Sequence, residues 1–210
     1  MRKTRITALL LCALMIVPNA GCGSKSSKKS NTSKANAQIV GDEPGEPVRN
    51  AYQQDANIGK NEVVADIKEE AEANDTGFTL NRVIAYKDPE RSEKYIYFDV
   101  NIKNDTSDTY DLSVLNNFYL IYPDGNEKYS DIKTELYANS KFQNYYMSPF
   151  NIPANGEFKG IVGGFAVDPS LDEFTIGFFP TRVDNRNKES VIKIKVTPDL
   201  IVDNPSDILK

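Results

Sequence analysis

A regular alternation of apolar and polar positions in residues 95–103 constrains the fold of this chain more than any other sequence feature. The apolar positions are Ile96, Phe98, Val100 and Ile102. The side chains between them are Tyr95, Tyr97, Asp99, Asn101 and Lys103. Successive side chains of a β-strand point to opposite faces of a sheet, so this pattern predicts a strand with one buried face and one face in water. A helix would scatter the same apolar side chains around its circumference.

The same pattern recurs along the chain and predicts an all-β domain in residues 61–210. Besides residues 95–103, strands are expected at 78–86, 118–122, 127–130, 157–167, 173–179 and 190–197. About seven short strands without a strong helix between them are typical of an antiparallel β-sandwich or barrel. The break in alternation at Arg82 predicts a β-bulge, and the glycines at 160, 163 and 164 predict a bulge or a close backbone approach.

Residues 62–74 leave two interpretations open. Val63, Ile67 and Ala71 recur at a spacing of four in a segment rich in Glu, Ala and Lys, which favours a short helix. The apolar run at 63–65 could equally begin an edge strand. Of the two, we expect the helix.

Residues 1–21 have the pattern of a secretory signal peptide. Three basic residues among the first five precede an apolar stretch at 6–17, and small residues follow it. The apolar stretch is too short to span a bilayer, which takes about 20 residues. We therefore expect this segment to direct export and then to be removed.

The end of this segment, Ala20-Gly21-Cys22, resembles the bacterial lipobox, although Asn19 stands where that motif has a leucine-like residue. The resemblance implies that Cys22 is diacylated and becomes the first residue of the mature protein. Two acyl chains are enough for stable anchoring, so the protein would be held at the extracellular face of the bacterial cell membrane. The alternative is a plain secretory signal with an incidental cysteine.

Residues 22–60 are predicted to form a flexible linker between the anchor and the folded domain. They are rich in Ser, Lys and Asn and show almost no apolar periodicity, so they cannot bury enough apolar surface to offset the entropy of ordering. The domain that follows is acidic, because residues 61–210 hold 16 basic and 26 acidic side chains. Nucleic acid is therefore not expected as a partner, since its binding rests on basic side chains at phosphates.

The chain contains no histidine, which narrows the chemistry it can perform. Ser-His-Asp and Cys-His nucleophile pairs, histidine general bases and histidine-containing zinc sites are all excluded. Nothing in the spacing of the acidic residues selects a carboxylate pair for glycoside hydrolysis or the ligands of a calcium loop. We therefore expect no catalytic residue, no cofactor and no metal.

The best candidate for a recognition surface is the ring-rich stretch at residues 137–150. Its large rings are Tyr137, Phe142, Tyr145, Tyr146 and Phe150. Tyrosine is enriched at recognition surfaces because its ring is apolar and its hydroxyl is polar. Binding loops of sandwich domains lie at strand ends, and this stretch is interpreted as such a loop. The alternative is that these rings cap the open end of the sandwich as part of its core.

An ordered series of motifs resembles a known family. The series comprises residues 95–103, the turn at 104–108, residues 118–120, Asp124-Gly125, residues 152–157, and residues 161–167 before Asp168-Pro169. It covers about residues 78–196 and looks like a family of uncharacterised immunoglobulin-like domains in lipoproteins of Gram-positive bacteria. The fold of that family is similar to telokin and to a secreted immunoprotective antigen of mycobacteria. The resemblance implies an immunoglobulin-like sandwich at the cell surface and assigns no catalytic residue.

These observations together predict a non-catalytic, lipid-anchored extracellular binding or structural module of the cell envelope. Its partner would be an envelope protein or a glycan. One alternative is an extracellular enzyme that uses carboxylates on envelope polysaccharide. Another is an accessory domain of an export or sensing complex that is recognised through a sheet edge.

Overall fold

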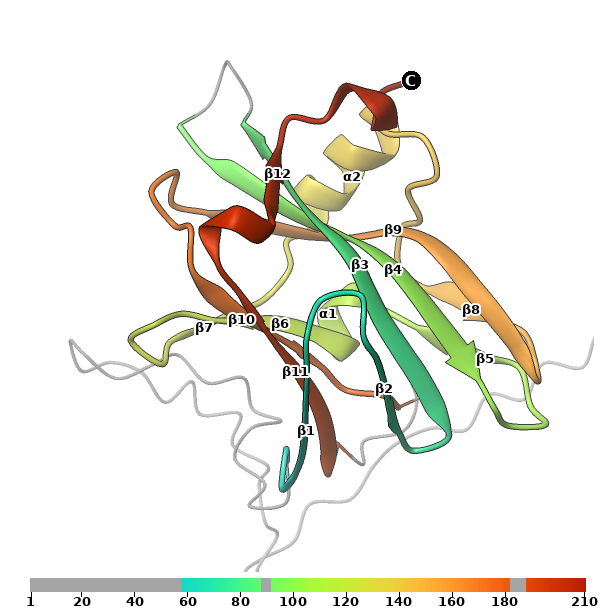
Figure 1. The fold of residues 1–210 in the computed structure, drawn as a ribbon. Coiled ribbons are helices and arrows are strands. Elements are labelled where there is room, and N and C mark those ends of the chain that lie inside the picture. The colour runs from blue at the N-terminus through green and yellow to red at the C-terminus, as the bar shows by residue number, and fades with distance from the viewer. Residues whose placement is uncertain (1–57, 88–91, 182–187) are drawn as a thin grey trace, which may run out of the picture. The chain divides into compact units, whose positions relative to one another are not determined.

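The computed structural model describes residues 58–87, 92–181 and 188–210. The predicted signal peptide, Cys22 and residues 23–57 of the predicted linker lie outside these ranges. Within them the chain forms twelve strands, two α-helices and two 3₁₀ turns (Figure 1). The strands are β1 (Asn61–Ala65), β2 (Glu70–Ala73), β3 (Thr76–Lys87), β4 (Lys94–Asn104), β5 (Tyr110–Leu112), β6 (Phe118–Ile121), β7 (Glu127–Lys128), β8 (Phe150–Ile152), β9 (Gly156–Val167), β10 (Phe174–Phe178), β11 (Ser190–Val196) and β12 (Ile201–Asp203). The helices are α1 (Val114–Asn117) and α2 (Ile132–Lys141), and the 3₁₀ turns are η2 (Pro198–Leu200) and η3 (Ser206–Ile208).

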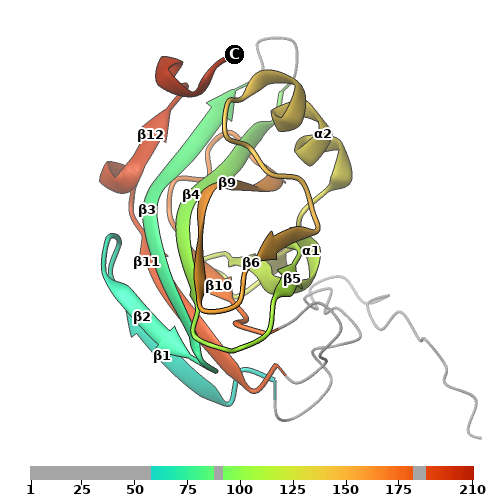
Figure 2. The ribbon, with the colours of Figure 1, turned by 90° about the vertical axis from the view of Figure 1, so that its right-hand side faces the viewer.

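The strands form two main sheets that pack face to face (Figures 1 and 2). Sheet A has the order β1-β11-β10-β6-β7, and sheet B has the order β12-β3-β4-β9 with β2 added beside β3. A separate small pair joins β5 to β8. In the described ranges the pairing is antiparallel except for β1 with β11 and β12 with β3, which run parallel. The predicted all-β sandwich is confirmed, and the strands beyond the seven predicted ones have three to five residues each.

The core lies between the two sheets and is built largely from phenylalanine rings. Phe78 and Phe98 of sheet B meet Phe118 and Phe178 of sheet A, with neighbouring ring centroids 4.5–6.1 Å apart. The apolar positions of residues 95–103 all face this core, as their alternation predicts. Burial of these rings removes large apolar areas from water, which is the main driving force for closing the two sheets on each other.

Both predicted irregularities in the strands are present. The register between β3 and β4 shifts between Leu80 and Arg82, which is the position where the alternation breaks. Between β4 and β9 the register shifts at Gly163 and Gly164, whose φ angles are 109° and 139°. Side chains with a Cβ rarely adopt such angles, so glycine is required for this bulge.

The prediction of a helix in residues 62–74 is wrong. The segment forms β1 and β2 instead, and the alternative of an edge strand at 63–65 holds. β1 pairs with β11 over the whole length of β1, and β2 pairs with β3 over the whole length of β2. A turn at Lys68, whose φ is 68°, connects β1 to β2. Helix propensity contributes only tenths of a kcal/mol per residue, so these backbone pairings override it.

The prediction that Tyr95 and Tyr97 face water is also wrong, because α2 covers them (Figure 2). Tyr97 is 0% exposed, and its hydroxyl donates a hydrogen bond to the backbone oxygen of Thr134 at 3.0 Å. The ring of Tyr95 lies 5.3 Å from the ring of Tyr137. Gly164 permits this close approach, since a Cβ atom there would come within 2.7 Å of Thr134 Oγ1.

The helix α2 overlaps the stretch at residues 137–150 that was predicted to be a loop, and its residue pattern explains the difference. Its apolar residues Ile132 and Leu136 are exposed, whereas Thr134 and Glu135 are buried. This is the reverse of the pattern by which an amphipathic helix is recognised. The helix begins at a side-chain cap, in which Asp131 accepts the backbone N–H of Lys133 at 2.9 Å.

The described residues begin before the predicted domain boundary at residue 61. Gly59 donates its backbone N–H to the carbonyl oxygen of Lys188 at 2.8 Å. Ile58 packs beside Tyr119 on sheet A. The folded domain therefore includes Ile58 and Gly59, which were predicted to belong to the linker.

The two-sided burial of β4 leads to a stability prediction. Tyr97→Ala is expected to lower the free energy of unfolding by about 3–5 kcal/mol, as much as Phe98→Ala, because both rings are fully enclosed. Tyr97→Phe keeps the ring and removes one hydrogen bond, so it should cost about 0.5–1.5 kcal/mol. Chemical denaturation of the three variants measures these differences. A small loss for Tyr97→Ala beside a large loss for Phe98→Ala would show that α2 does not pack on this face.

Candidate functional site

The structure separates the five residues predicted to form a recognition surface. Phe142, Tyr145 and Phe150 are buried, and Tyr137, a residue of α2, is partly buried against Tyr95 of sheet B. Tyr146 is 43% exposed. Four of the five rings therefore pack into the domain, but Tyr137, Phe142 and Tyr145 lie on the outer face of sheet B and do not cap the open end of the sandwich. Tyr146 keeps substantial exposed surface.

The buried rings of this set belong to two packing clusters. Phe142 meets Tyr97 edge to face with centroids 5.0 Å apart, and the hydroxyl of Tyr145 donates to the carbonyl oxygen of Gly163 at 2.7 Å. Phe150 lies 4.6 Å from Phe158 of β9. These contacts hold α2 and the segment after it against sheet B, so truncation of these rings acts first on stability.

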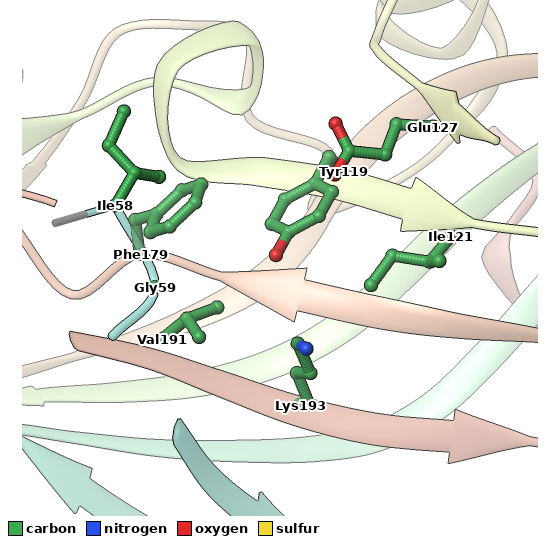
Figure 3. Close-up of a pocket in the computed structure, with 8 residues that line it drawn as sticks. All are labelled: Ile58, Gly59, Tyr119, Ile121, Glu127, Phe179, Val191 and Lys193. Atoms are coloured by element: carbon green, nitrogen blue, oxygen red, sulfur yellow. The ribbon is translucent and has the colours of Figure 1, made fainter. Parts of the chain in front are cut away.

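A different surface, on the outer face of sheet A, has the features of a binding site. Strands β6 and β11 carry apolar residues on both faces, not on the core face alone. β10 is followed directly by a further outward apolar residue, Phe179. The outward ones are Tyr119, Ile121, Phe179 and Val191. Together with Ile58 they line a half-open groove of about 200 Å³ (Figure 3). The outer face of an antiparallel sheet is usually polar, so an apolar groove there needs a functional or structural reason.

Gly177 shapes this groove. Tyr119 and Gly177 are direct partners in the pairing of β6 with β10. The ring of Tyr119 lies over Gly177, where a Cβ atom would overlap the ring. The ring is thereby free to stack on Phe179 at 5.1 Å and on Tyr129 at 6.1 Å, with interplanar angles of 14° and 18°. Three nearly parallel rings thus run across the outer face of sheet A.

Charged side chains border the rings and are engaged with partners. Glu127 accepts a hydrogen bond from the hydroxyl of Tyr129 at 2.8 Å, and Lys193 forms a 2.6 Å ion pair with Glu62. Burial, followed by the negative charge of Glu127, raises the pKa of Tyr119 and Tyr129 well above the ordinary tyrosine value. Both hydroxyls therefore stay protonated near neutral pH.

Lys188 is a buried cation at the end of the ring stack. Its Nζ lies 4.9 Å from the ring centroid of Phe179 and donates a hydrogen bond to the backbone oxygen of Asn116 at 2.5 Å. Burial lowers the pKa of this amine from 10.5 to about 8. The folded protein therefore buries an amine that changes from charged to neutral near pH 8.

The described ranges offer neither a metal site nor a helix that could span a membrane. No group of three or more acidic or cysteine side chains in these ranges lies where it could hold a metal ion. None of the helices in this part of the chain is long and apolar enough to cross a bilayer.

The sequence contains a signal for the groove that alternation alone does not reveal. Residues 118–121, 178–179 and 191–192 are uninterrupted apolar runs. A continuous apolar run is typical of a strand with both faces covered. These runs were predicted as strands, and Tyr119 was considered for an outward aromatic patch with Tyr95 and Tyr97. That patch does not form, because β4 and β6 belong to different sheets.

Comparison with known proteins identifies the family of this chain. The model of a family described as a domain of unknown function, DUF4352, matches residues 65–170. A search of the curated proteins gives no match.

Three solved structures are similar to the chain at low identity. The yjhA protein from Bacillus subtilis has 13% identity and a TM-score of 0.45, with 62% of this chain and 98% of that chain covered. The candidate lipoprotein ycdA from Bacillus subtilis subsp. subtilis strain 168 has 15% identity and a TM-score of 0.43, with 62% of this chain and 38% of that chain covered. An uncharacterized β-sandwich protein from Clostridium difficile 630 has 17% identity and a TM-score of 0.39, with 66% and 95% covered.

The lowered pKa of Lys188 predicts how stability depends on pH. The folded protein releases the Lys188 proton near pH 8, whereas the unfolded chain holds it up to about pH 10.5. Between these values the unfolded chain binds more protons, so the free energy of unfolding should rise with pH. Chemical denaturation between pH 7.5 and 9.5 measures the rise, at pH values below the titration of free tyrosine near about 10.

Lys188→Met should remove most of this rise and stabilise the protein at pH 7.5. Lys193→Met is the matched control, because it deletes a partly exposed lysine of β11 and should leave the rise in place. An unchanged rise in Lys188→Met would assign the pH dependence to another group.

Proposed function

The chain belongs to the DUF4352 family, and we propose that it is a non-catalytic binding module, lipid-anchored at the extracellular face of the bacterial cell membrane. The anchor is proposed from the lipobox-like sequence Ala20-Gly21-Cys22 after the apolar stretch at 6–17. The binding role is proposed from one observation, the apolar groove and its stacked rings on the outer face of sheet A.

The binding surface is proposed to extend beyond the groove to the edge of sheet A. Val64 of β1 is the register partner of Lys193, which lines the groove, so the two side chains share the outer face. Val64 is 72% exposed. We define the apolar face as Val64, Tyr119, Ile121, Phe179 and Val191. Tyr119, Phe179 and Val191 form its enclosed part, at 5%, 4% and 0% exposed, and Val64 and Ile121 form its accessible margin. Exposed apolar side chains beside an apolar groove are typical of a protein-binding site.

Binding is proposed in preference to catalysis because of what the groove offers a ligand. The hydroxyl of Tyr119, its one tyrosine among the described residues, stays protonated near neutral pH, so it donates a hydrogen bond and does not act as a base. Its cation, Lys193, is occupied by Glu62. Apolar contact framed by a few polar groups provides affinity and orientation, which is the usual composition of a binding site.

The partner is proposed to be an envelope protein. Val64 and Ile121 offer aliphatic area, which complements an apolar protein surface. Residues 61–210 carry an excess of ten acidic over basic side chains, so a basic rim on the partner would speed association. The Phe179 and Tyr119 rings are 4% and 5% exposed, so they are proposed to form the floor of the groove and to hold the accessible residues Val64 and Ile121 in place.

The architecture is proposed to be a variant of the immunoglobulin-like, telokin-like fold that the sequence resembles. Two packed sheets with largely antiparallel pairing support this proposal. Both cysteines, Cys12 and Cys22, precede residue 58, so the core of this variant is held together by packing without a disulfide.

The anchor leads to a fractionation prediction. Cys22→Ser should move the protein from the membrane fraction to the medium, or leave it unprocessed, because it removes the acylation site. Cys12→Ser, inside the apolar stretch, is the control and should leave the protein with the membranes. A correctly cleaved Cys22→Ser protein that still fractionates with membranes would contradict the lipoprotein proposal.

The apolar face leads to a binding prediction. Val64→Asp and Ile121→Asp each introduce a charge on this face and should weaken partner retention by at least about 1 kcal/mol. Retention is measured by pull-down from an envelope extract with mass spectrometry. Val202→Asp, at an exposed apolar position of β12 in the other sheet, is the matched control.

The thermal stability of the three variants decides whether lost retention reflects binding or unfolding. All three substitutions are at positions with exposed or partly exposed side chains, so melting temperatures should change little. The binding role of the apolar face is refuted if all three folded variants retain the same proteins equally well.

A further inference from the structure

The helix α2 presents aliphatic side chains to solvent on the side that faces away from sheet B. Ile132 and Leu136 are 57% and 54% exposed, and residues four positions apart lie on the same side of a helix. Thr134 and Glu135, on the inner side, are each 3% exposed. An aliphatic pair is therefore on the outside of α2, and a polar pair is on its inside.

Hydrogen bonds account for the polar pair on the inner side. The hydroxyl of Thr134 donates to the carbonyl oxygen of Asp131 at 2.6 Å, and the carboxylate of Glu135 accepts the backbone N–H of Ser148 at 3.0 Å. Both groups are thus buried with partners, as buried polar groups generally are. The aliphatic pair has no such account, because no apolar cluster of the described residues includes Ile132 or Leu136.

Two lysines border the aliphatic pair. Lys133 is exposed beside it, and Lys141 is exposed in the last turn of α2. The carboxylates of the helix and its cap are turned to other contacts, because Glu135 is buried and Asp131 accepts the backbone N–H of Lys133 at 2.9 Å. The outer side of α2 therefore combines aliphatic side chains with cations, on a domain whose acidic side chains outnumber its basic ones.

This combination fits a lipid surface better than a protein surface. Aliphatic side chains of an interfacial helix enter the boundary between headgroups and acyl chains, and lysines reach the anionic headgroups with their long stems. Protein contacts are usually centred on aromatic or arginine anchors. The exposed side chains of α2 include neither kind; they are Ile132, Lys133, Leu136, Asn139, Ser140 and Lys141.

The chain before the described domain is long enough to allow this contact. The first described residues lead into β1, which lies at the end of the sandwich away from α2 (Figures 1 and 2). The 35 residues between Cys22 and Ile58 could extend to at most about 120 Å. A domain of about 150 residues is only about 40 Å across. Acyl chains on Cys22 would thus keep α2 within reach of the bilayer at a high effective concentration, where a weak contact is populated.

From this geometry we propose that the outer side of α2 docks on an anionic lipid bilayer through Ile132 and Leu136, with Lys133 and Lys141 at the headgroups. This inference rests on the proposed anchor at Cys22, which supplies the local concentration. The apolar face lies on the opposite side of the sandwich, on the outer face of sheet A. Docking through α2 therefore turns the apolar face away from the bilayer, toward the proposed envelope protein.

The test uses the absence of tryptophan from the chain. Leu136→Trp places a single fluorescent indole on the outer side of α2, and Ile132→Trp is a second reporter if the first does not fold. The acylated protein is isolated from membranes and reconstituted into vesicles of phosphatidylcholine and phosphatidylglycerol. Matched vesicles carry lipids brominated near the headgroup end of their acyl chains. We expect blue-shifted emission that bromine quenches strongly.

A second position and a charge variant make the readout specific. Val64→Trp, at a 72% exposed position on the outer face of sheet A, is the control and should be quenched little. Lys133→Glu in the Leu136→Trp chain should lower the ratio of bilayer-bound to free α2 at least about fivefold, the factor that one lysine contributes near an anionic surface. Glutamate suits the first turn of a helix, so α2 should stay folded. Lys195→Glu on sheet A is its charge-matched control and should leave the quenching unchanged.

Flotation of the vesicles separates this inference from the proposed anchor. Protein that floats with the vesicles while bromine does not quench Leu136→Trp overturns the docking of α2 and leaves the anchor intact. Blue-shifted emission without quenching would mean that a second copy of the protein covers α2, and equal quenching of Val64→Trp would mean that the whole domain approaches the bilayer; each overturns the proposal. Protein that does not float overturns the anchor and the docking together.

Discussion

The rest of the structure depends on the burial of both faces of β4. On one face Phe98 and its alternating neighbours close the space between the two sheets, and on the other Tyr97 lies beneath α2. The two faces use different interactions. The inner one is apolar packing, whereas the outer one adds the hydrogen bond from the Tyr97 hydroxyl to Thr134 and a set of edge-to-face rings. A central strand enclosed in this way fixes the position of its two neighbours, β3 and β9, and with them both bulges.

The bulge in β9 links this strand to the helix. Gly163 and Gly164 bring the backbone close enough for the N–H of Asp131 to donate to the carbonyl oxygen of Gly164 at 3.0 Å. Asp131 also caps α2, so the helix begins at the point where it meets the sheet. A helix this short and polar has little stability of its own. Its position therefore comes from the glycine bulge and the tyrosines beneath it, and the segment that ends at Tyr146 takes its place from the helix.

The outer faces of the two sheets differ in polarity. Sheet B is divided between the rings under α2 and a field of paired charges around Arg82. Sheet A carries stacked rings and aliphatic side chains, with its charges at the border. The surface ion pairs contribute little to stability.

The sequence by itself determined the class of fold, the positions of the main strands, the acidic character of the domain and the two bulges. Each of these follows from local rules: side chains alternate along a strand, and only glycine accepts the backbone angles of Gly163 and Gly164. The tertiary structure decided what covers each face. By local rules alone, Tyr97 is predicted to face solvent and residues 62–74 are predicted to be helical; the packing of α2 and the pairing of β1 with β11 and β2 with β3 overturn both predictions.

The same division holds for the candidate sites. Tyr146 was predicted as a surface ring from composition, but its neighbours in the sequence, Tyr145 and Phe150, proved to be core residues. The groove of Tyr119 and Phe179 unites residues that are far apart in the chain. No local pattern reports such pairs, because their distance is set by strand register and sheet packing. The sequence therefore determined which side chains were available for binding, and the pairing of strands decided which of them meet.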